Sequence, residues 1–428
     1  MSTLDFGYGE SVLHVRIPQR NLLGVIKPND VEISTDETRE IESALSNPIG
    51  TPRLSEIAGE GDRVAIIASD ITRPSPSSKL LPPLIAELSA GGVSLGDIRV
   101  IFALGIHRKH STEEMRRLVG ENIFSRVTCM DHQADNCVDV GHTRSGTKVE
   151  VFKDIPEYDV LVCTGNIEPH YMAGYSGGLK AILPGVCSRN TIEQNHQMMT
   201  QPGSRAGKTD GNPLRQDIDD VSNLVNVDMI VNAIQNEKRR IVKVVAGDPV
   251  TAHRKGAEYS DMIYKVKVPE PAEIVITSPG GYPRDINLYQ AQKALENARQ
   301  AIKPGGIIIL VAECREGSGD PVFQEWLSEA SSPNEVVNRI SRKFVLGGHK
   351  AAAFASVMRE HQVYLVSSMS AELVNRMHFK AAPTVEKALD EALHDLGEDV
   401  QILVLPEGND TLPVIEPKVP HDKSQNSY

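Results

Sequence analysis

Short apolar runs that alternate with helical segments constrain the fold of this chain more than any other feature. Residues 63–70 read Arg-Val-Ala-Ile-Ile-Ala-Ser-Asp, and a segment of helical period follows at 77–90. Similar apolar runs at 98–105 and 159–165 also end in turn residues. Strands that are apolar along their whole length are buried on both faces, which is typical of parallel sheets covered by helices. We therefore predict an α/β protein with mainly parallel strands.

A second α/β unit is predicted after a break in the pattern at residues 265–272. Two prolines in this stretch, Lys-Val-Lys-Val-Pro-Glu-Pro-Ala, interrupt the helical pattern before a new strand at 273–278. The further elements expected in this unit are one helix and three strands, at 287–302, 307–314, 362–368 and 400–405. We therefore expect domains at 1–268 and 269–416, followed by a polar, disordered tail at 417–428.

Composition and charge exclude several classes of protein. The 428 residues include 45 Lys and Arg against 57 Asp and Glu, a formal net charge of −12 that argues against nucleic-acid binding. No apolar run approaches the ~18 residues that a membrane span needs. The start, MSTLDFGYGE, lacks the features of a secretory signal, so a cytoplasmic location is expected. Five cysteines without a CxxC pair argue against a disulfide framework or a structural zinc site.

Polar residues collect where the predicted strands end. Asp70 and Arg73 follow the first strand, His107 follows the second, and His170 lies just beyond the third. Ligands of open α/β sheets bind beyond the carboxyl ends of the strands, so these side chains are expected to face one crevice. Imidazole exchanges protons near neutral pH, and guanidinium binds a carboxylate in a bidentate manner. The alternatives are structurally bonded or surface histidines and a solvated arginine.

A glycine-rich segment at 168–185 carries one lysine, Lys180, shortly after Ser176, Gly177 and Gly178. Glycine lets the backbone approach a ligand closely. The segment is not a P-loop, because GxxxxGK[ST] is absent and no hydroxyl residue follows the lysine. A lysine in a partly desolvated pocket is a good nucleophile, so covalent attachment of a ligand is one interpretation.

Two further positions are less specific by spacing alone. His196 lies within a helix that opens at Ser188, and no metal-ligating partner occurs at the i, i+4 spacing, so a bonded core histidine is the simpler interpretation. Gln290 and Lys293 are spaced i, i+3 near the start of a predicted helix. They share one helix face, which is a suitable site for an anion.

Taken in order, six motifs resemble the lactate racemase family, which is the nickel-pincer enzyme family. They are DxxR at 70–73, LGxHR at 104–108, SGGxK at 176–180, NH at 195–196, NLYQAxK at 287–293 and GGHKA at 347–351. The resemblance covers most of the chain, and the ordered set is far more specific than any one motif. It implies a two-domain α/β enzyme with its active site in the cleft between the domains.

The resemblance also implies a role for each matching residue. His107 and His170 match the acid/base pair, and Asp70 matches an acidic residue near His107. Lys180 matches the lysine that forms a thioamide with a nickel-pincer nucleotide, and His196 matches the histidine that completes nickel coordination. The predicted cofactor-binding residues are Asp70, Ser176, Gly177, Gly178 and Lys180. The predicted substrate-binding residues are Arg73, Met172, Tyr289, Gln290 and Lys293.

The implied reaction is inversion of C2 of a 2-hydroxy acid. Removing hydride from C2 to the cofactor avoids an unfavourable carbanion beside the carboxylate. One histidine takes the hydroxyl proton, and the second supplies the proton when hydride returns to the other face. Lactate-specific members close the pocket with aromatic side chains, whereas Met172 stands two residues after His170 here. The sequence therefore favours a larger or more polar substrate, such as an aldonate or a hydroxy-dicarboxylate.

Three other functions stay open at this stage. Lactate racemase proper is the first alternative. A dehydrogenase that uses NAD is disfavoured, because no GxGxxG follows a predicted strand. A cofactor-binding homologue without turnover would not need both His107 and His170. The expected partners are the small-molecule acid and the proteins that make the cofactor, with a homodimer as the oligomeric form and no membrane.

Overall fold

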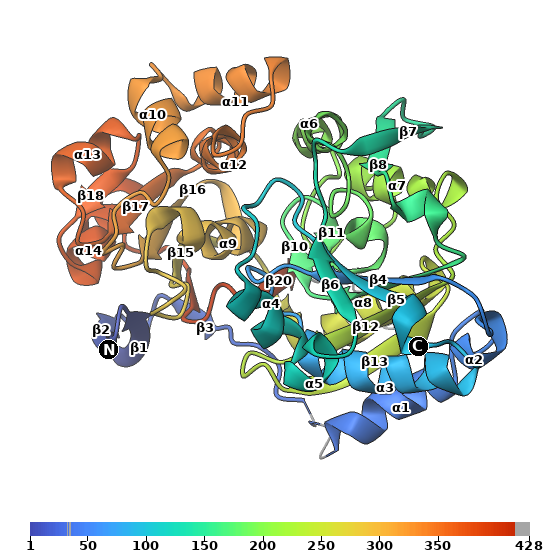
Figure 1. The fold of residues 1–428 in the computed structure, drawn as a ribbon. Coiled ribbons are helices and arrows are strands. Elements are labelled where there is room, and N and C mark those ends of the chain that lie inside the picture. Colours follow the sequence, from blue (N-terminus) through green and yellow to red (C-terminus); the bar gives the residue numbers. More distant parts are fainter. Residues whose placement is uncertain (32, 34–35, 416–428) are drawn as a thin grey trace, which may run out of the picture. The chain divides into compact units, whose positions relative to one another are not determined.

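The structure is a computed structural model that describes residues 1–31, 33 and 36–415. The chain divides into two compact units, each of which contains a six-stranded sheet (Figure 1). The central unit comprises Asn29–Tyr264 and Ile340–Val345. The terminal unit comprises Met1–Pro28, Lys265–Arg339 and the described residues from Leu346 onward.

The sheet of the central unit has the order β13-β12-β9-β4-β5-β6. Its strands are β4 (Val64–Ser69), β5 (Ile98–Ala103), β6 (Thr128–Asp131), β9 (Val160–Asn166), β12 (Met229–Gln235) and β13 (Ile241–Gly247). Neighbouring strands are parallel except β12 and β13, which are antiparallel. Every residue of β9 and β12 is buried, because helices and loops cover both faces of the sheet.

Two apolar clusters hold the helices of the central unit against opposite faces of its sheet. The helices on one face are α1 (Glu37–Ser46), α2 (Leu54–Ile57), α3 (Ser77–Ala90), α4 (Thr112–Val119) and α5 (Glu121–Phe124). Those on the other face are α6 (Arg189–Gln197), α7 (Pro213–Asp220) and α8 (Thr251–Tyr264). Two short strand pairs complete the unit: β7 (Cys137–His142) with β8 (Lys148–Phe152), and β10 (Pro169–His170) with β11 (Gly174–Tyr175).

The sheet of the terminal unit is parallel throughout, in the order β18-β17-β16-β15-β19-β3. Its strands are β3 (Leu22–Val25), β15 (Ala272–Thr277), β16 (Ile302–Val311), β17 (Gln362–Val366), β18 (Lys380–Ala382) and β19 (Ile402–Leu405). Two pairs flank it: β1 (Ser2–Tyr8) with β2 (Ser11–Ile17), and β14 (Lys265–Val268) with β20 (Leu412–Ile415). The helices are α9 (Leu288–Ala298), α10 (Pro321–Glu329), α11 (Pro333–Arg342), α12 (Gly348–Met358), α13 (Ala371–Arg376) and α14 (Val385–Leu396).

The predicted α/β class with mainly parallel strands is confirmed, and the break at 265–272 coincides with the boundary after Tyr264. The predicted first domain, 1–268, differs from the observed division. Residues 1–28 belong to the terminal unit, because β3 pairs with β19 at the edge of that sheet. A pairing across so many residues leaves no local pattern in the sequence. The predicted tail at 417–428 lies outside the described residues.

Within residues 1–31, 33 and 36–415, no helix has the length and apolar character needed to cross a membrane.

Candidate active site

The predicted catalytic residues of the central unit gather at one edge of its sheet. Strand β4 pairs in parallel with both β5 and β9, so the carboxyl ends of all three strands meet there. Asp70 follows β4 directly, His107 lies in the loop after β5, and His170 lies in β10 just after β9. The sequence placed these residues at strand ends, and the strand order brings the three ends together.

Asp70 and His107 form a closely bonded pair. The His107 side chain is 34% exposed and that of Asp70 is 2% exposed, and Nδ1 of His107 donates to Asp70 Oδ2. Burial by itself raises the pKa of Asp70, but the hydrogen bond and charge of His107, with the charge of Arg73, outweigh it and lower that pKa. The ionised carboxylate fixes the proton on Nδ1 and leaves Nε2 of His107 with its lone pair.

His170 has a different environment. Its Nδ1 lies 3.4 Å and 3.3 Å from the backbone N–H groups of Met172 and Ala173, so Nδ1 accepts and the neutral ring carries its proton on Nε2. The Tyr171 ring stacks on it at 5.1 Å between centroids. Burial, and then the positive charges around the ring, lower the pKa of His170 well below its ordinary value. In order of effect, these charges belong to Lys180, Arg73, His196 and Arg215.

Lys180 lies in the short 3-10 turn at Gly178–Ala181. Burial of its ammonium group, together with the charges of Arg215 and Arg73, lowers the pKa of Lys180 well below its ordinary value. Within the part of the chain that the structure describes, Lys180 makes no hydrogen bond or ion pair through Nζ. An amine whose pKa is lowered by burial and by neighbouring cations is suited to nucleophilic attack.

The two glycines before Lys180 are required by packing against protein groups. A side chain at Gly177 would lie 2.8 Å from Asn232 Oδ1, and one at Gly178 would lie 2.8 Å from the His253 ring. Both glycines also have positive φ. Ser176 is held by its own loop, because its Oγ donates to Asn166 O at 2.8 Å. These contacts within the protein are enough to explain why the motif has a serine and two glycines. Cofactor binding by Ser176, Gly177 and Gly178 stays a prediction.

Two fully buried side chains that the sequence did not single out support the segment between His170 and Lys180. Both come from the start of α7. Arg215 donates to the carbonyl oxygens of Ala173, at 3.1 Å, and of Tyr175. Asn212 donates to the carbonyl of Met172 at 2.9 Å. Neither residue stands in a motif that spacing could flag, because their role depends on three carbonyl groups about forty residues away.

His196 occupies the last turn of α6, where the sequence placed it. The adjacent Asn195 is fully buried and donates to Asp217 at 2.8 Å, which anchors this helix. The rings of His196 and Phe344 pack in a T-shaped arrangement, with centroids 5.4 Å apart. The charge of His196 contributes to lowering the pKa of His170, so the two rings interact electrostatically.

Met172 is buried, and its predicted contact with substrate stays a prediction. Its side chain is 4% exposed and packs in the apolar cluster beneath the sheet, with Leu179 and Ile182. The aromatic residue nearest to His170 is instead Tyr171, which stacks on its ring. Residue 172 therefore contributes to core packing, which by itself explains an apolar side chain at this position.

Tyr289, Gln290 and Lys293 lie in α9 of the terminal unit. The helix begins after Asn287, whose side chain accepts from the Gln290 backbone at 3.0 Å. Gln290 is exposed and the other two are partly exposed, so all three leave the buried face of α9. Lys350 adds a charge here, because its Nζ donates to Tyr289 O at 3.0 Å and lies 4.3 Å from the centre of that ring. Their predicted contact with substrate stays a prediction, as does a cleft between the domains.

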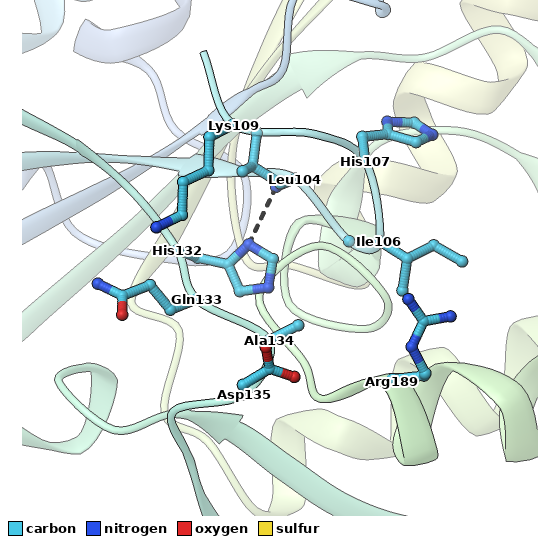
Figure 2. A pocket seen from close by; sticks show the side chains of 10 residues that line it. Leu104, Ile106, His107, Lys109, His132, Gln133, Ala134, Asp135 and Arg189 are labelled. Carbon is cyan, nitrogen blue, oxygen red and sulfur yellow. Dashed lines mark hydrogen bonds between the residues drawn. The ribbon is translucent and has the colours of Figure 1, made fainter. Parts of the chain in front are cut away.

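A pocket of about 230 Å³ adjoins the loop that carries His107 (Figure 2). Lys109, Arg189 and Asp135 contribute charged groups to its lining. Figure 2 shows the His107 ring turned away from Lys109, while His132 Nδ1 accepts from the Leu104 backbone at 3.2 Å. His132 thus secures the end of β5 beneath the loop.

The fold is that of an α/β enzyme, and one edge of its sheet carries two histidines, a carboxylate, an arginine and a lysine of lowered pKa. The comparisons with known proteins name the family. The model of the lactate racemase N-terminal domain matches residues 8–207, and that of the lactate racemase C-terminal domain matches residues 267–412. The chain belongs to the lactate racemase family, whose members are isomerases.

Individual relatives agree along nearly the whole chain. The lactate racemase of Thermoanaerobacterium thermosaccharolyticum is 35% identical over 95% of this chain and 98% of its own. That of Lactiplantibacillus plantarum is 31% identical over 95% of this chain and 99% of its own. The solved apoprotein from the first organism superposes with a TM-score of 0.88, covering 97% of this chain and 100% of its own at 33% identity. A Thermotoga maritima protein, 18% identical with a TM-score of 0.66, shares the fold over 89% of this chain and 98% of its own.

Proposed function

We propose that this enzyme racemises a small 2-hydroxy acid, with lactate as the first substrate to test. The observation that carries the proposal is the Asp70–His107 pair at the sheet edge that also carries His170. Support comes from two relatives named lactate racemase that align over nearly the full chain. The argument for a larger acid loses its basis, because Met172 is a core residue and Tyr171 lies against His170.

We also propose that the enzyme uses a nickel-pincer nucleotide, attached at Lys180 with His196 as a nickel ligand. The lowered pKa of the Lys180 amine fits covalent attachment, and the charges of Arg73 and Arg215 fit an anionic nucleotide or substrate. No three metal-ligating side chains gather within residues 1–31, 33 and 36–415, and His196 is the residue that would contact the nickel of the bound nucleotide. When bound, this group would accept hydride from C2 and return it.

In this proposal the chain's own residues orient the acid and move the hydroxyl proton. Arg73 binds the carboxylate through parallel hydrogen bonds. Nε2 of His107 takes the hydroxyl proton, and the Asp70 carboxylate stabilises the imidazolium that forms. His170 offers its Nε2 proton to the C2 oxygen as a hydrogen bond. When C2 regains its hydrogen, the C2 oxygen recovers its proton from the His107 imidazolium, which restores the neutral ring, while His170 keeps its Nε2 proton and only hydrogen-bonds to that oxygen.

The test is racemisation of each lactate enantiomer in D₂O by the chain co-produced with a cofactor pathway. Intact mass identifies loaded protein, and a Lys180→Gln variant should lose the adduct. Hydride return predicts that the racemised product keeps hydrogen at C2. Deuterium at C2 would contradict this mechanism, and an adduct without turnover on lactate, malate or aldonates would indicate a non-catalytic homologue.

Supply of the cofactor by other proteins, a homodimer and a cytoplasmic location stay predictions.

A further inference from the structure

A second histidine and aspartate pair, His110 and Asp131, lies next to the catalytic pair and was not singled out by its sequence. Their side chains are 1% and 8% exposed. Asp131 accepts twice from the same residue, from His110 Nδ1 at 2.6 Å and from the His110 backbone N–H at 2.8 Å. The Phe102 ring meets the imidazole edge-on, with centroids 5.0 Å apart. The orientation of the imidazole is therefore fixed on three sides.

The other nitrogen of His110 has a defined partner as well. Its Nε2 accepts from the backbone N–H of Ile71 at 3.1 Å. A nitrogen that accepts carries no proton, so the ring is neutral with its proton on Nδ1, directed at Asp131. Both ring nitrogens are thus engaged by protein groups. His110 has no nitrogen left for a substrate, and its contribution must act through Ile71.

Ile71 is the centre of the turn that carries two predicted site residues. The Arg73 backbone N–H donates to Asp70 O at 3.1 Å, and Asp70 Oδ1 accepts from Thr72 through its backbone at 3.1 Å and its hydroxyl at 2.8 Å. These bonds shape the turn internally. They do not fix the turn relative to the loop after β5, which carries His107.

That loop holds the turn through two residues. Nδ1 of His107 bonds to Asp70 and lies 3.4 Å from Thr72 Oγ1, and three residues later Nε2 of His110 bonds to the Ile71 backbone. The His107 contacts reach side chains of the turn, whereas the His110 bond reaches its backbone. Together these contacts set the positions of Asp70 and Arg73 relative to His107.

We propose that His110 and Asp131 are positioning residues for the reaction, holding the Asp70–Arg73 turn against the His107 loop. This inference deepens the proposed function and rests on it for its catalytic consequence. The chemistry remains with Asp70, His107 and Arg73. His110 and Asp131 set the positions from which His107 contacts the substrate hydroxyl group and Arg73 contacts the substrate carboxylate.

Two substitutions at His110 each remove one of its two side-chain hydrogen bonds, the one with Ile71 or the one with Asp131. His110→Gln places an amide oxygen where Nε2 stood, so it can accept from Ile71 but loses the donor to Asp131. His110→Asn places an amide near Nδ1, so it keeps the donor to Asp131 but leaves the Ile71 N–H without its acceptor. Each variant loses one buried hydrogen bond, which makes the two a matched pair for stability.

In cofactor-loaded enzyme, positioning predicts that kcat/KM of His110→Asn falls below that of His110→Gln by about tenfold, the effect of one lost hydrogen bond. We expect a raised KM, because a displaced Arg73 binds the carboxylate of the substrate less well. We also expect a lowered kcat, because Asp70 and His107 no longer meet the hydroxyl group correctly. Equal kcat/KM in the two variants, or a decrease that follows Tm alone, would overturn the inference.

A measurement on the full-length protein without cofactor gives an independent result. With ¹⁵N-labelled histidine, the wild-type His110 should show a protonated Nδ1 and an unprotonated Nε2. The His107 resonances should shift in His110→Asn and stay near their wild-type values in His110→Gln. An Nε2-protonated His110, or unmoved His107 resonances in both variants, contradicts positioning. The same spectra with no racemase activity in loaded enzyme would contradict the proposed function instead.

Discussion

Nδ1 of His107 donates its hydrogen to a carboxylate, Asp70, that is almost wholly enclosed, while the histidine ring itself reaches toward solvent. The buried partner therefore holds the ring, and the exposed edge presents Nε2. His170 shows the opposite arrangement, because backbone N–H groups face its Nδ1 and cations surround it. The two histidines have the same side chain and contrasting environments, which is what a pair with complementary proton roles requires.

Replacing Asp70 with Asn should lower kcat/KM in both directions by about 10² or more, within the range that acid/base catalysis contributes. The neutral amide can no longer stabilise an imidazolium at His107, and its NH₂ group competes for Nδ1. The measurement is racemisation of each enantiomer by loaded enzyme. The control is Asp5→Asn, which alters the exposed His14–Asp5 pair, bonded at 2.7 Å with side chains 70% and 68% exposed. A loss of the same size in the control would refute the specific role of Asp70.

Lys180 should react with acetic anhydride at lower pH than ordinary lysines do in protein without cofactor, because burial and the charges of Arg215 and Arg73 lower its pKa. The extent of labelling follows the neutral fraction of the amine. Peptide mapping across pH gives the midpoint, with the exposed Lys109 as the internal reference. Arg73→Gln should move the Lys180 midpoint upward. Identical midpoints for Lys180 and Lys109 would show that the amine is not perturbed.

Arg215→Met should lower the free energy of unfolding by about 3–5 kcal/mol, the usual cost of breaking a buried charged network. Tyr175 O would lose the Arg215 donor, and Ala173 O would keep only the bond from the Tyr175 backbone N–H at 2.9 Å. Urea unfolding followed by circular dichroism measures the change. Arg144→Met is the matched control, because that side chain is 84% exposed in its ion pair and should change stability by less than about 1 kcal/mol. A small effect at Arg215 would mean that the carbonyls find other donors.

The stability of the enzyme should fall below pH ~6.5 partly through His253, since an unfolded histidine titrates there. Burial, and then the charge of Arg215, hold the pKa of His253 well below that value in the folded chain. The unfolded state therefore binds a proton that the folded state does not, and stability is lost as pH decreases, at up to ~1.4 kcal/mol per pH unit.

His253→Gln can keep the donor to Ser176 O, which lies 2.9 Å from Nε2, and removes the titration. Its free energy of unfolding should depend less steeply on pH between 6.5 and 5 than that of the wild type. Denaturant unfolding at a series of pH values measures both slopes, and parallel slopes would assign the acid sensitivity to other groups.

Local patterns in the sequence determined the elements and most of the predicted site. Helix α3 spans the predicted residues 77–90, and a capping box of Ser111 and Glu114 opens α4. Strand ends placed Asp70, His107 and His170, and an ordered set of motifs named the family that the comparisons confirm. These features depend on side-chain periodicity and turn chemistry within a few residues, which a sequence records directly.

Tertiary structure decided the features that depend on residues far apart in the chain. It assigned residues 1–28 to the terminal unit through the pairing of β3 with β19, and it placed Met172 in an apolar cluster. It also revealed Arg215 under the Lys180 segment and the bond from Ile71 to His110. Burial, a low pKa and a specific hydrogen bond arise when distant segments exclude water together, and no local run of residues encodes that.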